Sequence, residues 1–129
     1  MAADLVSWAG SRGIAHTRDD AGNVLLGRGS GPILQAHLDM VDTDPGRGPL
    51  SWREQDGWIC GQKRSLGADN GVGLALALDL LNREGPDSHW RALFTVGEED
   101  GLKGARRVDP AWLNGSGLIN LDAQEEGVL

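Results

Sequence analysis

The alternation of apolar and polar residues predicts a helix and then a hairpin at the start of the chain. Residues 4–12 carry apolar side chains at helical spacing, and Gly13 is typical of a helix end. The period then changes, and residues 14–18 and 24–28 flank a group of turn-forming residues. Two antiparallel strands are therefore expected after the first helix.

The middle of the chain predicts an interior strand, a second hairpin and a long helix. Residues 32–36 form a short apolar run that ends in the polar segment 37–39, as is typical of an interior strand. A loop rich in Asp, Pro and Gly comes next, and a hairpin is expected over residues 52–60. Residues 70–84 are apolar on nearly every side, which predicts a buried helix capped by Asp69 and lying against a sheet.

The rest of the chain predicts two more strands with short helical pieces between them. The strands are expected over residues 90–96 and 117–121, and the helical pieces over residues 102–107 and 110–113. This order predicts an α/β fold with a mixed, largely parallel sheet flanked by helices. All 129 residues fit within the size of one domain.

Charge and composition narrow the classes of partner. The chain has 12 Lys and Arg against 19 Asp and Glu, a formal net charge of -7. Nucleic acid and anionic membranes attract positive surfaces, so neither is expected as a partner. No apolar run approaches the roughly 20 residues that cross a bilayer. The single cysteine, Cys60, cannot form an internal disulfide, which favours a cytoplasmic setting.

Four polar clusters lie where predicted strands end or where the long helix begins. They are His37 with Asp39, Asp69, Glu98 with Glu99, and Asp122. Ligands bind at the carboxyl edge of the strands in an open α/β sheet, so these clusters can converge. Each has an ordinary alternative as a lone histidine, a helix cap, an exposed acidic turn or a strand-end carboxylate. Together, one imidazole and several carboxylates form a donor set that a divalent cation such as zinc accepts.

Four ordered segments carry a more specific signal. They read VLLGRGSGPILQAHLDMV, LGADNGVGLALAL, TVGEEDGLKGA and LINLDAQEEG. In this order they resemble the signature segments of the aminoacyl-histidine (Xaa-His) dipeptidases, a group of co-catalytic zinc peptidases. The resemblance implies the N-terminal part of a metallopeptidase catalytic domain, with the second half of that domain and the lid and dimerisation domain absent. The partners it implies are a small peptide substrate and either a homo-oligomer or a complementing C-terminal chain.

The resemblance assigns metal ligands to four of the polar residues. His37 and Asp122 would bind one ion, and Asp69 would bridge it to a second ion. Glu99 would bind the second ion together with a histidine that the family supplies near its C-terminus, for which this chain has no match. Zinc is the metal that the resemblance implies, and the same donor set would also accept manganese or cobalt.

The resemblance also assigns catalytic roles. Glu98 would be the general base for a metal-activated water that hydrolyses the peptide bond. Asp39 would accept a hydrogen bond from the ring nitrogen of His37 that does not face the metal. A cis peptide bond is implied between Asp69 and Asn70.

Two alternatives to a working Xaa-His dipeptidase stay open. The residues after Asp122 depart from the usual family pattern, and His16 and His89 lie outside the four segments. One alternative is therefore an inactive or degenerate metal-binding fragment. The other is an aminoacylase, a carboxypeptidase or a tripeptidase of the same group.

Overall fold

The computed structural model describes residues 1–41, 48–115 and 117–122. Its helices and strands appear in the predicted order, with their ends moved by a few residues. They are α1 (Ala2–Ser11), β1 (His16–Arg18), β2 (Val24–Leu26), β3 (Ile33–His37), β4 (Trp52–Gln55), β5 (Trp58–Gly61), α2 (Ala68–Glu84), β6 (Arg91–Thr95), the 3-10 helices η1 (Ala105–Arg107) and η2 (Pro110–Leu113), and β7 (Leu118–Asn120).

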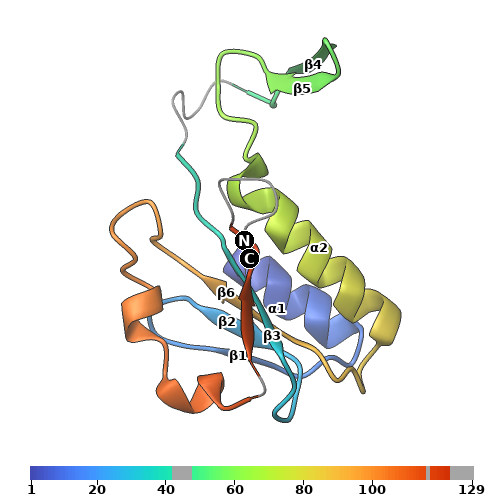
Figure 1. The fold of residues 1–129 in the computed structure, drawn as a ribbon, viewed down its shortest axis with the longest axis vertical. Coiled ribbons are helices and arrows are strands. Elements are labelled where there is room, and N and C mark those ends of the chain that lie inside the picture. Colours follow the sequence, from blue (N-terminus) through green and yellow to red (C-terminus); the bar gives the residue numbers. More distant parts are fainter. Residues whose placement is uncertain (42–47, 116, 123–129) are drawn as a thin grey trace.

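A five-stranded mixed sheet forms the centre of the molecule, in the order β1-β2-β6-β3-β7. Strand β3 is parallel to both β6 and β7, whereas β2 is antiparallel to β1 and β6. Helices α1 and α2 lie side by side on one face of this sheet (Figure 1). The predicted fold class, a mixed and largely parallel sheet flanked by helices, is confirmed.

The core lies between the sheet and the two helices. Alternation along β3 turns Leu34 and Ala36 toward the helices, and Phe94 of β6 joins them there. Ala77 and Leu81 of α2 are fully buried against these strands. Burial of this apolar surface is the main driving force that holds the helices on the sheet.

Helix α2 differs from the prediction in two ways. It was expected to be buried on nearly every side, but Val72 and Leu76 are each 57% exposed, because only one side of the helix meets the sheet among the described residues. The predicted cap is also wrong, because the N-cap residue is Gly67. Asp69 lies in a non-helical stretch at the start of α2, and its side chain points to another strand end.

The predicted second hairpin is present as a separate two-stranded sheet of β4 and β5. It projects from the body of the molecule beyond the start of α2 (Figure 1). Neither described helix combines the length and apolar character needed to cross a membrane.

A buried arginine that the sequence did not point to fixes the segment with η2 on the sheet. The guanidinium of Arg91, at the start of β6, donates hydrogen bonds to the carbonyl oxygens of Gly31, Trp112 and Asn114. The burial of this group lowers the pKa of Arg91 below its ordinary value. The carbonyl oxygens stabilise the buried charge. The hydrogen bonds of this one side chain connect the segment before β3 to the end of η2.

Gly73 allows α2 to approach the end of β7 closely. A Cβ atom at this position would lie 3.0 Å from both Cβ and the carbonyl oxygen of Leu121 and would collide with Oδ1 of Asn70. A hydrogen atom is all that fits between the helix and this strand end. Asp122 follows Leu121 in the chain. The close approach of α2 to this strand end therefore brings two of the predicted site residues, Asp69 and Asp122, near each other.

We predict that Gly73→Ala lowers the free energy of unfolding by about 1–3 kcal/mol, because the added methyl group overpacks this contact. Gly71→Ala is the matched control, since a Cβ atom there meets no atom within 4 Å. Urea unfolding followed by circular dichroism measures both variants. Equal stability of the two variants would contradict the close approach at Gly73.

Candidate metal centre

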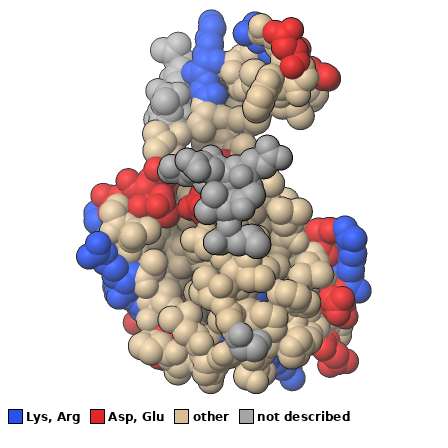
Figure 2. All heavy atoms as spheres, in the orientation of Figure 1, with Lys and Arg blue, Asp and Glu red and all other residues tan. Residues whose placement is uncertain are grey.

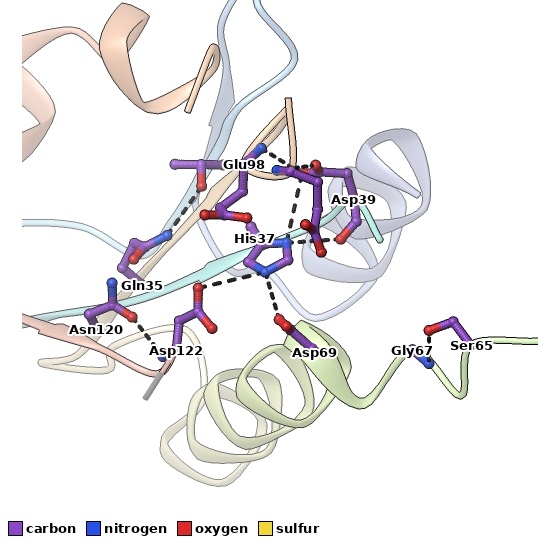
Figure 3. Close-up of polar contacts among 11 residues, drawn as sticks. Gln35, His37, Asp39, Ser65, Gly67, Asp69, Glu98, Asn120 and Asp122 are labelled. Atoms are coloured by element: carbon purple, nitrogen blue, oxygen red, sulfur yellow. Dashed lines mark hydrogen bonds and ion pairs between the residues drawn. The ribbon is translucent and has the colours of Figure 1, made fainter. Parts of the chain in front are cut away.

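The predicted site residues converge at the carboxyl edge of the parallel strands (Figure 3). His37 is the last residue of β3 and pairs with Thr95, the last residue of β6. Asp122 follows β7 by two residues, and Asp69 extends from the start of α2 toward the same point. Segments more than 80 residues apart in sequence thus meet around one imidazole.

The buried ring of His37 forms the centre of this cluster. Its Nδ1 atom lies 2.8 Å from the backbone carbonyl oxygen of Asp39. A carbonyl oxygen can only accept, so Nδ1 carries the proton and donates. Its Nε2 atom lies 2.9 Å from Oδ1 of Asp69 and 3.7 Å from Oδ2 of Asp122. In the neutral ring, the Nε2 lone pair therefore faces two carboxylates.

This arrangement places acceptors opposite acceptors unless a positive charge lies between them. A second proton on the ring is one such charge, and a divalent cation bound by Nε2 and the carboxylates is the other. Burial alone would lower the pKa of His37. The hydrogen bonds to Asp69 and Asp39 and the nearby charge of Asp122 outweigh burial, so the pKa lies above its ordinary value of 6.5.

Glu99 adds a further carboxylate donor to this group. One ligand atom each from His37, Asp69 and Glu99 lies within 4.8 Å of the other two. One imidazole nitrogen and two carboxylate oxygens make up a mixed donor set that zinc, manganese or cobalt accepts. The residues present therefore fit a divalent metal.

Asp39 contacts the ring of His37 through its backbone and not through its side chain. The backbone carbonyl oxygen accepts the ring hydrogen bond, whereas Oδ1 of Asp39 lies 3.8 Å from Nδ1. The two carboxylate oxygens instead accept hydrogen bonds from the backbone N–H groups of Glu98 and Glu99, each at 3.1 Å. The carboxylate turns away from the ring because these two donors, in the loop after β6, take up its oxygens.

Asp39 therefore fixes both the ring of His37 and the backbone of the two glutamates. Burial would raise the pKa of the Asp39 carboxyl, but the N–H donors of Glu98 and Glu99 and the nearby His37 outweigh it. The pKa of Asp39 is lowered from its ordinary value of 3.8.

Asn23 closes the base of the loop that carries the glutamates. Its Oδ1 accepts a hydrogen bond from the Val96 N–H at 3.1 Å, and its Nδ2 donates to the carbonyl oxygen of Gly104 at 3.0 Å. Its Nδ2 also donates to Asp19 at 2.7 Å. The sequence indicated only a turn at Asn23. Its complete burial and its hydrogen bonds to a loop more than 70 residues away carry no local signal.

The loop after β6 gives one face of the molecule an acidic patch (Figure 2). Glu99 and Asp100 are exposed there, and Glu98 is half-buried. A local excess of negative charge attracts a cation and raises its concentration near the cluster. The patch is consistent with a cation site beside His37.

The remaining histidines do not contribute to the cluster. His16 lies in β1 and His89 precedes β6, and both are exposed. They are surface or strand residues, as predicted. The departure from the family pattern after Asp122 lies outside the described residues.

Comparison with known proteins points to peptidases. No protein-family model matches the chain. The chain is 36% identical, over 98% of its length, to the cytosol non-specific dipeptidase of Escherichia coli K12 and spans 30% of that protein. The chain is homologous to part of a peptidase. The peptidase resemblance stated from the four segments is therefore confirmed.

Solved structures agree with this result. The aminoacylhistidine dipeptidase of Vibrio alginolyticus matches with a TM-score of 0.80 at 32% identity, over 98% of this chain and 29% of that one. A tripeptidase from Staphylococcus aureus matches with a TM-score of 0.79 at 25% identity, over 95% of this chain and 37% of that one. The chain thus spans about a third of these peptidases. The cis peptide bond that the resemblance implied between Asp69 and Asn70 is also present.

We predict that Asp39→Asn lowers the free energy of unfolding at neutral pH by about 1–3 kcal/mol, because an amide cannot accept both N–H groups as a carboxylate does. The folded-state pKa of Asp39 is lowered, so its contribution is present above pH 3.8 and is lost as the pH falls through the folded-state value. The variant should therefore lose less stability than the wild type on acidification below about pH 4.

Urea unfolding between pH 2.5 and 7 measures this difference. Asp87→Asn, at an exposed carboxylate outside the site, is the control and should follow the wild type. An Asp39→Asn profile parallel to the wild type over the whole range would show that the carboxylate does not hold the glutamate backbone.

Proposed function

We propose that this chain is the metal-binding part of a zinc-dependent dipeptidase. The observation that supports it most strongly is the orientation of His37, whose Nδ1 donates to a carbonyl while Nε2 faces Asp69 and Asp122. In this proposal these three residues would hold one ion, and Asp69 and Glu99 would hold a second. The family likeness and the mixed donor set support zinc, and manganese or cobalt would fit the same ligands.

Bound divalent ions supply a water of lowered pKa and a Lewis acid that polarises the scissile carbonyl. The residues of this chain hold and orient the reactants around them. Glu98 takes the proton from the attacking water and delivers it to the leaving amine, as a general base and then an acid. Its backbone N–H is fixed to Asp39, so the same aspartate aligns the ring of His37 and the base.

The proposed substrate is a dipeptide of the Xaa-His type, hydrolysed in the cytoplasm. A dipeptidase agrees with the names of two similar proteins, the cytosol non-specific dipeptidase of Escherichia coli and the aminoacylhistidine dipeptidase of Vibrio alginolyticus. The likeness to a tripeptidase keeps a longer peptide as a second substrate class. The last ligand of the second ion would come from a complementing C-terminal chain.

A metal-binding protein without hydrolytic activity is the second candidate. One observation favours it: the described residues bring a single histidine, His37, to the cluster, and His16 and His89 lie elsewhere. A second ion with only carboxylate ligands would be held more weakly than one with an imidazole. Metal binding and hydrolysis must therefore be measured separately.

We predict that the purified chain binds zinc and that Glu98→Gln retains this affinity while losing hydrolysis of an Xaa-His dipeptide such as Leu-His. Glutamine keeps the shape and the backbone N–H but cannot accept the proton from water. Isothermal titration calorimetry gives the zinc affinity, and release of free histidine gives the rate. Asp100→Asn is the control, since this exposed neighbour pairs with Lys103 and should keep both properties.

Loss of a residue that only hydrogen-bonds to a metal ligand lowers metal affinity roughly 10–100-fold. His37→Ala removes a proposed ligand itself, so it should reduce zinc affinity by more than this. Unchanged zinc affinity in His37→Ala would exclude the proposed site. Zinc binding without hydrolysis in the wild type would support the inactive metal-binding protein instead.

A further inference from the structure

A cavity of about 280 Å³ lies on the face of the sheet opposite to α1 and α2. Side chains of the parallel strands form its floor, including Gln35 of β3, Leu93 of β6 and Leu118 of β7. The segment with η1 and η2 forms its wall through Ala105 and Leu113. Its volume is near the lower end of the range found for cavities that bind small molecules.

The cavity is continuous with the proposed metal site. Glu98 and Asp122, both at the carboxyl edge of the sheet, line one end of it. Side chains two residues apart on a strand share a face, so Gln35 and His37 lie on the same side of β3. Figure 3 shows Gln35 and Asp122 next to each other beside the ring of His37.

The lining of the cavity selects for an uncharged, apolar group. Aliphatic side chains, among them Leu93, Val108 and Leu113, make up much of it, and its charged lining residues are the two carboxylates at the metal end. The amide of Gln35 donates to the hydroxyl of Thr95 at 3.1 Å, so part of its polarity is already used within the protein. An acidic group would meet two like charges at the entrance, whereas an aliphatic group loses contact with water and gains contact with leucine side chains.

We propose that this cavity binds the aliphatic or aromatic side chain of the N-terminal residue of the dipeptide substrate. The inference rests on the proposed function, because it places the scissile carbonyl beside Glu98. That carbonyl belongs to the N-terminal residue, whose side chain branches from the next carbon atom. With the carbonyl at the end lined by Glu98 and Asp122, the side chain of the same residue enters the cavity.

The test measures dipeptide binding and metal binding in the same full chain. Zinc affinity is determined first by calorimetry. The zinc-loaded Glu98→Gln chain, which should bind dipeptides without hydrolysing them, is then labelled at its leucine methyl groups, titrated with Leu-Gly and with Gly-Gly, and followed by NMR. We expect the Leu93, Leu113 and Leu118 methyl signals to shift with Leu-Gly, which should bind at least about 10-fold more tightly than Gly-Gly.

Ala105→Phe fills the cavity and should remove the preference for Leu-Gly while leaving zinc affinity unchanged. Ala75→Phe, on the exposed side of α2, is the matched control and should keep the preference. A second variant, Leu118→Ala, enlarges the cavity and should shift the preference toward Phe-Gly, which tests the inference if Ala105→Phe does not fold.

Normal zinc affinity with equal binding of Leu-Gly and Gly-Gly, or a preference that survives Ala105→Phe, would overturn this inference and leave the proposed function standing. Absence of zinc binding would overturn the proposed function and this inference with it. Separate zinc and dipeptide titrations keep the two failures distinguishable.

Discussion

The contact between His37 and the carboxylates around it is the constraint on which the rest of the structure depends. Nδ1 of the ring donates to a backbone carbonyl, and Nε2 therefore faces Asp69 and Asp122. Nε2 can face them as an unprotonated acceptor, as a protonated donor or as a metal ligand. An acceptor in that position is unfavourable, because the lone pair of the buried ring would face the negative charges of two carboxylates. The geometry is satisfied only when a positive charge lies between the imidazole and the acids.

The fold maintains this arrangement through a few contacts between distant segments. Parallel pairing of β3 with β6 and β7 brings three strand ends to one edge. Gly73 allows α2 to approach the end of β7, and Asn23 holds together the base of the loop that carries the glutamates. Asp39 then connects that loop to the ring of His37, so the hydrogen bonds of one residue orient both a proposed ligand and the proposed base.

Local pattern accounts for much of the architecture that was predicted. Strands β3 and β6 are short apolar runs, and α2 is a long apolar segment, so both periodicity and length identify them. The convergence of His37, Asp69 and Asp122 could be predicted because the carboxyl ends of parallel strands share an edge. The zinc-peptidase roles came from the likeness of four segments and remain proposals for this chain.

Contacts between distant segments account for what the sequence did not predict. Whether Asp39 uses its carbonyl or its carboxylate toward His37 depends on donors that lie about 60 residues away. The buried guanidinium of Arg91 is satisfied by carbonyl groups whose positions follow from the packed fold. The exposed side of α2 likewise depends on which elements pack around it, and an apolar sequence specifies burial without specifying a partner.

X-ray absorption spectroscopy at the zinc edge of the zinc-loaded chain tests the central claim most directly. The account predicts a first coordination sphere of oxygen and nitrogen. The spectrum should also show the outer-shell scattering of one imidazole for the ion at the His37 site, and this signal should be absent in His37→Ala. A sulfur ligand, which would point to Cys60, or imidazole scattering that persists in His37→Ala would contradict it.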